Sequence, residues 1–140
     1  MLMSTLMLFA GQAMAEEVTI NFDADYATLF PTIAGTSSND SHDGDFTGAT
    51  ASTPVSGVTV TVTPADDAKT PSRLWYSSPV LRMYSGTFTV SGTDITKIVF
   101  NSGSNFNINT ATGTLSGKTW TGEKCSEVVF NVEKNTQLKS

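Results

Sequence analysis

The sequence predicts an all-β fold, an antiparallel β-sandwich or barrel, from two observations. Serine and threonine make up 38 of the 140 residues, and most threonines alternate with Val, Ile or Phe, which suits pleated sheet better than helix. Short alternating segments also recur about every ten residues between turns rich in Gly, Asn and Ser, as in sandwiches and barrels. The net charge of -5, without a Lys/Arg cluster, argues against a nucleic-acid partner.

The first fifteen residues are expected to be a signal peptide. An apolar run over residues 2–10 is too short to span a bilayer, and it precedes Ala13-Met14-Ala15, an A-x-A cleavage site. We therefore expect cleavage after Ala15, a secreted or cell-surface location, no membrane insertion, and one β-sandwich domain over residues 16–140. The usual basic segment is missing, so we expect the leader to be truncated at its start.

The first half of the domain is expected to contain two strands. Residues 18–22 alternate apolar with polar side chains and predict the first strand. Residues 26–33 are apolar at mixed spacing and are broken by Pro31, which predicts a short helical turn or an irregular stretch. The polar composition of residues 35–48 predicts a loop, whereas the perfect alternation of residues 58–63 predicts the clearest strand, followed by a loop over residues 65–72.

Shorter strands are expected to follow, separated by glycines. They are residues 73–76, 80–84, 87–91, 95–101, 106–109 and 127–133. The junctions at Ser85-Gly86 and at residues 91–94 resemble tight hairpins and predict a meander over residues 80–101. Residues 136–140 begin another strand that is short or truncated. If it is incomplete, its exposed edge could pair with another chain, so we expect a monomer or an edge-strand dimer.

Catalysis has little support in the sequence. Cys125 is the only cysteine and His42 the only histidine, in a loop far away in sequence, so a structural cysteine is favoured over a Cys/His nucleophile. Acidic residues concentrate in loops and near strand ends, without the carboxylate pair that a glycoside hydrolase needs. No histidine cluster for zinc and no glycine-rich phosphate loop is present. We expect a protein that is not an enzyme.

One loop contains oxygen ligands at alternating positions. Asn39, Asp43 and Asp45, with Gly44 at the sixth position, resemble the first half of a calcium loop. The pattern lacks Asp at position 39 and Glu at position 50. Calcium is thus a minor alternative, and an ordinary solvated loop without any cofactor is favoured.

Arginines and aromatic residues share the faces of two adjacent predicted strands. Arg73 lies two residues from Trp75, and Arg82 lies two residues from Tyr84, so each pair points to one side. Such a face can bind a sugar, with rings stacking on the sugar and Arg donating paired hydrogen bonds. Alternatively, the rings belong to the core and Arg makes a structural cation-π contact. Trp120, between Gly117 and Gly122, is either a loop-borne platform for ligand or a packing residue.

Four segments of the chain carry a resemblance to a known group of proteins. They are Pro71-Ser72-Arg73-Leu74-Trp75, Leu81-Arg82-Met83-Tyr84, Ile95-Thr96-Lys97-Ile98-Val99-Phe100 and Trp120-Thr121-Gly122. Together they resemble the secreted, largely uncharacterised β-sandwich modules of Bacteroidetes-type gut bacteria. The resemblance implies a jelly-roll-like sandwich and export, but no established ligand and no catalytic residue. In that group the final segment runs on as Ile-x-x-Ile-x-Val-x-Tyr, so part of the last strand is expected to be missing.

Two functions follow from these expectations. The first is an exported binding module for carbohydrate or another cell-surface component, such as a surface protein. Its expected contact residues are Arg73, Trp75, Arg82, Tyr84 and Trp120. The second is a structural spacer or adhesion domain of an extracellular protein, without a small-molecule ligand. Burial of both tryptophans, with no exposed aromatic groove, would favour the second.

Overall fold

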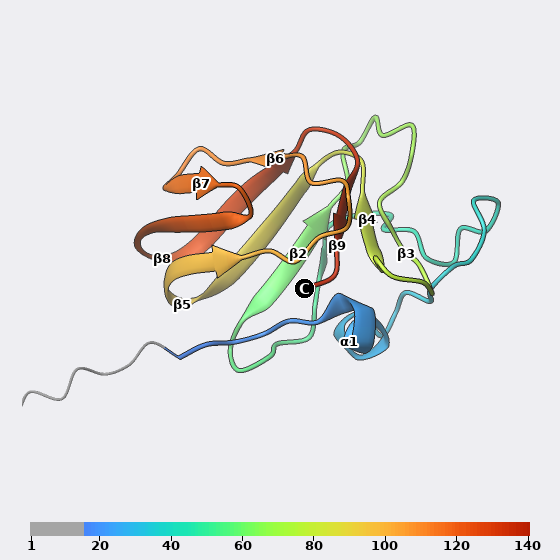
Figure 1. Cartoon of the computed structure of the whole chain (residues 1–140). Coiled ribbons are helices and arrows are strands. Elements are labelled where there is room, and N and C mark those ends of the chain that lie inside the picture. The colour runs from blue at the N-terminus through green and yellow to red at the C-terminus, as the bar shows by residue number, and fades with distance from the viewer. Residues whose placement is uncertain (1–15) are drawn as a thin grey trace, which may run out of the picture.

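The computed structural model describes residues 16–140, which form two antiparallel β-sheets and one helix (Figure 1). The expected all-β, sandwich-like fold is confirmed, whereas the predicted signal peptide lies outside the described residues. The large sheet has the order β1-β2-β5-β8-β6, with β7 also paired to β8, and the small sheet has the order β3-β4-β9. The elements are α1 (Phe22–Leu29), β1 (Thr50–Ala51), β2 (Thr59–Thr63), β3 (Arg73–Leu74), β4 (Leu81–Met83), β5 (Thr87–Val99), β6 (Ile108–Asn109), β7 (Thr114–Ser116), β8 (Thr119–Val132) and β9 (Thr136–Leu138).

The first predicted strand, residues 18–22, does not form, and a helix begins at its last residue and extends into the region where a helical turn was one of the alternatives. Residues 16–21 have no regular secondary structure, and α1 begins at Phe22. The Asn21 side chain caps the helix by accepting a hydrogen bond from the Ala24 amide at 3.1 Å, and two acidic residues, Asp23 and Asp25, occupy the first turn. Acidic side chains favour the positive end of the helix dipole, so these local interactions outweigh the short alternating pattern.

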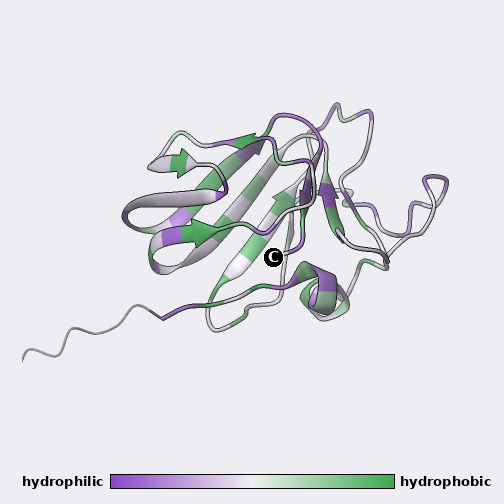
Figure 2. Ribbon diagram, in the orientation of Figure 1, coloured by the Kyte–Doolittle hydropathy of each residue, from purple (hydrophilic) through white to green (hydrophobic). Residues whose placement is uncertain are grey.

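The core lies between the two sheets and consists largely of the inward residues of the long strands. Val60 and Val62 of β2, together with Phe88 of β5, are buried, while the threonines between them are half-buried on the outer face. Figure 2 shows this alternation as green and pale bands along the strands. The ring of Phe100 packs edge-on against Phe130 with centroids 5.0 Å apart. Hydrophobic burial by alternating positions therefore holds the sheets together.

The single long strand β5, which pairs antiparallel with β8, replaces two predicted strands and the turn between them. Residues 87–91 and 95–99 belong to one strand, and the register with β8 shifts between Ser91 and Ile95 and again between Ile95 and Lys97. Asp94, which was expected in a tight turn, has a positive φ of 52°. The polar residues of this stretch thus form a bulged region within the strand. β8 also begins at Thr119, earlier than the predicted residue 127.

The predicted meander over residues 80–101 is wrong because β4 and β5 belong to different sheets. Gly86 connects them with a φ of +83°, and a Cβ atom at this position would lie 2.0 Å from the Thr63 carbonyl oxygen. Only glycine fits such a close approach of two backbones. The segment crosses between the layers at this residue instead of turning back in the same sheet.

The last strand is enclosed on both sides. β9 pairs with β4 through Met83 opposite Thr136, and its other edge bonds to the segment of residues 101–105, with the Gly103 amide donating to the Gln137 carbonyl at 2.9 Å. Thr136 and Leu138 are fully buried. The exposed edge that an incomplete last strand would leave at residues 136–140 is therefore not found in this part of the structure. Among residues 16–140, no helix has the length and apolar character needed to cross a membrane.

Candidate functional site

The outer face of the small sheet has a row of three polar residues. Arg73 of β3 lies directly opposite Arg82 of β4, which lies directly opposite Gln137 of β9. Residues paired in this way project to the same side of an antiparallel sheet. The predicted neighbourhood of the two arginines is therefore correct.

Trp75 lies beside both arginines. Its backbone amide donates to the Val80 carbonyl at 2.8 Å, which fixes the residue next to the loop that leads into β4. The guanidinium carbon of Arg82 is 4.4 Å from the centroid of the Trp75 ring, and that of Arg73 is 5.9 Å away. Both are within the range of a cation-π interaction. Only 9% of Trp75 is exposed, so little of this ring is open to a ligand.

A buried ion pair fixes Arg73. Its Nε lies 2.8 Å from Oδ1 of Asp45, and both side chains are almost fully buried. The other oxygen, Oδ2 of Asp45, lies 2.7 Å from Nδ1 of the exposed His42. Backbone bridges between Asp45 and Arg73 and between Thr36 and Trp75 add to these contacts. The polar loop of residues 35–48 is thus fastened to the edge of β3.

The three candidate calcium ligands, Asn39, Asp43 and Asp45, make other contacts. Asp45 already faces Arg73 and His42, and Asp43 accepts a hydrogen bond from the Ser41 hydroxyl at 3.0 Å. The backbone carbonyl of Asn39 faces Nη1 of Arg73 at 3.4 Å. Within residues 16–140, no group of three or more His, Cys, Asp or Glu is arranged to hold a metal ion. The carboxylates instead hold the loop together.

Arg82 and Tyr84 are more accessible than their neighbours. Both are half-buried, whereas Leu81 and Met83, which alternate with Arg82, are fully buried. The Nε of Arg82 donates to the Pro79 carbonyl at 3.0 Å. Among the described residues, no carboxylate lies within ion-pairing distance of Arg82, in contrast to Arg73.

Trp120 lies in the other sheet and does not join this cluster. It is part of β8, pairs opposite Ile98 and Leu115, and is only 1% exposed. Its indole Nε1 donates to the Thr112 carbonyl at 2.7 Å. A Cβ atom at Gly122 would lie 2.5 Å from the ring, so this glycine makes room for the indole rather than forming a turn. Of the two alternatives for Trp120, the structure has the packing residue and not the loop-borne platform.

The single cysteine lies on β8, the strand that also contains Trp120. Cys125 of β8 pairs opposite Ile95 and is half-buried, with its Sγ 3.5 Å from the Ile95 carbonyl oxygen. His42 lies in the loop beside β3, in contact with Asp45. The two residues of the rejected Cys/His pair therefore belong to different parts of the fold.

One exposed aromatic residue was not among the expected contacts. Tyr76 directly follows Trp75 and is 60% exposed. Its ring packs edge-on against Tyr26 of α1, with centroids 6.4 Å apart, and one of its faces lies over Gly35. Alternation could not have identified it, because alternation places Tyr76 on the same side as Leu74, which is fully buried.

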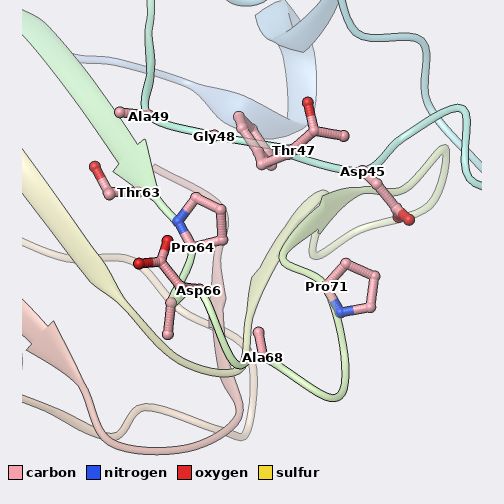
Figure 3. A pocket seen from close by; sticks show the side chains of 11 residues that line it. Asp45, Thr47, Gly48, Ala49, Thr63, Pro64, Asp66, Ala68 and Pro71 are labelled. Carbon is pink, nitrogen blue, oxygen red and sulfur yellow. The ribbon is translucent and has the colours of Figure 1, made fainter.

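A surface hollow of about 430 Å³ is formed by two loops (Figure 3). Small or cyclic residues such as Gly48, Ala68 and Pro71 make up most of its wall. Asp66 and Asp45 are its acidic residues, and Asp45 is held by Arg73. The hollow therefore lacks a set of side chains that could perform general acid and base chemistry together.

Comparison with known proteins gave no match to a protein family, to a curated protein or to a solved structure. The resemblance to modules of gut bacteria stays a prediction.

Proposed function

We propose that this chain is an exported, non-catalytic β-sandwich module that acts as a structural spacer or adhesion domain of an extracellular protein. The burial of both tryptophans carries the proposal. A sugar platform needs an aromatic face that a ligand can reach. Trp120 is 1% exposed and Trp75 is 9% exposed, so both rings are used in packing.

The arrangement of the polar groups supports the non-catalytic part of the proposal. Asp45 pairs with Arg73, and Oδ1 of Asp23 accepts a hydrogen bond from the Val80 amide at 2.9 Å. These carboxylates hold separate segments of the chain together. An acid/base pair for glycoside cleavage would instead need two carboxylates facing each other across a cleft.

A glycan microarray with the purified protein, run with calcium and again with EDTA, tests the proposal. We expect no binding to neutral glycans under either condition. Trp75→Phe and Trp120→Phe are the matched variants, because phenylalanine keeps an aromatic ring at each packing position. Reproducible binding to a neutral glycan that either variant abolishes while remaining folded would overturn the proposal.

A second candidate function is ligand binding through Arg82. The observation that favours it is the difference between the two arginines. Arg73 is buried against Asp45, whereas Arg82 is half-exposed and faces no carboxylate among the described residues. This function would not need the tryptophan faces.

A further inference from the structure

We propose that Arg82 is the anchor of a carboxylate-binding site on the outer face of the small sheet, and that its ligand is a uronic acid of an acidic glycan. The inference rests on the second candidate function and is independent of the spacer role.

The charges of this face are unequally compensated. The sequence contains two arginines, and they lie opposite each other on β3 and β4. Asp45 neutralises Arg73 at 2.8 Å, whereas within residues 16–140 Arg82 has only the carbonyl oxygen of Pro79 and the ring of Trp75 as partners. A half-exposed guanidinium without a carboxylate attracts an anionic group from solution.

The guanidinium of Arg82 is held in one orientation. Its Nε donates to the Pro79 carbonyl, and its central carbon lies 4.4 Å from the centroid of the Trp75 ring. Among residues 16–140, neither Nη atom makes a hydrogen bond to another residue. The two Nη groups are thus free donors on a preorganised group, so a ligand does not have to immobilise a flexible side chain.

Two neutral polar side chains flank the arginine. Gln137 pairs directly opposite Arg82, and Tyr84 lies two residues further along on the same side. Both are half-buried, and neither side chain makes a hydrogen bond within the described chain. Gly103 brings its loop against Gln137, since a Cβ atom there would lie 2.7 Å from Oε1. An amide and a phenol beside a guanidinium can bind sugar hydroxyls beside a carboxylate.

These features together indicate a uronic acid. A planar carboxylate can accept the two parallel hydrogen bonds that an arginine donates. The single negative charge of the carboxylate would balance the positive charge of Arg82, which has no acidic partner among residues 16–140. The hydroxyl groups of the same sugar ring would be the partners of Gln137 and Tyr84. Acetate offers the carboxylate without the ring, and glucose offers the ring without the carboxylate, so the two requirements can be separated.

NMR spectroscopy of the arginine side chains tests the site directly, because a chain with two arginines gives two Nε–H signals. Glucuronic acid should shift the Arg82 signal in a saturable way and leave the buried Arg73 signal unchanged. Glucose should shift neither signal, and acetate should bind more weakly than glucuronic acid. An unchanged Arg82 signal in a large excess of glucuronic acid would overturn the proposal. Equal affinity for acetate would overturn the assignment to a sugar.

Three variants complete the test, with binding followed through the backbone amide of Gln137. Arg82→Lys keeps the charge but loses the paired donors, and we expect affinity for glucuronic acid to fall about tenfold. Arg82→Gln should abolish binding. Lys97→Gln removes the same charge from an exposed position on β5 and should bind as the wild type does. Unchanged affinity in a folded Arg82→Lys variant would contradict the proposal without affecting the spacer role.

Discussion

Arg73 and Arg82 lie directly opposite each other on neighbouring antiparallel strands, although both are positively charged. Like charges at such positions destabilise a sheet unless other groups compensate for them. Asp45 lies 2.8 Å from Arg73, and the ring of Trp75 lies against Arg82. An acidic residue and an aromatic ring therefore allow the two cations to share one face of the sheet.

Asp45→Asn should destabilise the protein strongly. The substitution leaves the guanidinium of Arg73, which is 3% exposed, without its counter-ion. Breaking a buried ion pair from one side costs about 3 kcal/mol or more in the free energy of unfolding. Urea unfolding monitored by circular dichroism measures the change, and Asp43→Asn, in the same loop but exposed, is the control. Equal stability of the two variants would show that the ion pair contributes little.

Trp120→Ala should destabilise the part of the large sheet where β8 pairs with β5 and β7. It removes a buried indole and the hydrogen bond from Nε1 to the Thr112 carbonyl. We expect the free energy of unfolding to fall by about 3–5 kcal/mol. Val99→Ala, on the neighbouring β5, is a suitable control because Val99 is 62% exposed and should change stability by less than about 0.5 kcal/mol. A loss below about 1 kcal/mol for Trp120→Ala would contradict its packing role.

Gly86→Ala should impair folding. The backbone at Gly86 has a φ of +83°, and the new Cβ would collide with the Thr63 carbonyl oxygen. We expect a lower midpoint of thermal unfolding, measured by differential scanning calorimetry. Gly48→Ala is the matched control, since no atom lies within 4 Å of its Cβ position. A fall of the same size in both variants would mean that the crossing at Gly86 is not tightly constrained.

Calcium should not stabilise the protein. The carboxylate of Asp45 is engaged by Arg73 and His42, and Asp43 is bonded to Ser41, so binding an ion would break existing interactions. The thermal midpoint should be the same in calcium and in EDTA, because only a ligand that prefers the folded state raises it. A saturable rise of the thermal midpoint with calcium that Asp43→Asn abolishes would instead support a calcium site in this loop.

The sequence correctly predicted strands where the local pattern of side chains is strong. Alternation located the strand that contains Val60 and Val62. The two strands that contain Arg73 and Arg82 were expected to be neighbours, and they pair as β3 and β4. The ion pair of Asp45 and Arg73 could not be predicted, because its partners lie far apart in the sequence and meet only after the loop folds onto the sheet edge.

The errors arose where glycine and polar residues were interpreted as turns. Gly122 lies within β8 and leaves space for the indole of Trp120. Asp94 lies in a bulged region of β5 and not in a hairpin. Glycine in a strand can indicate close packing as well as a turn, and the two cases differ only in long-range contacts. The alternation of residues 18–22 was misleading for another reason, because these residues lead into a helix that Asn21 caps and that begins at Phe22.

Fluorescence quenching by acrylamide tests the central claim most directly, namely that the tryptophans are packing residues and not ligand platforms. The chain contains two tryptophans, so its emission reports on Trp75 and Trp120 alone. Because both are buried, we predict emission at short wavelength in the folded protein and quenching much weaker than after unfolding in urea. Quenching of the folded protein as strong as that of the unfolded chain would contradict the account.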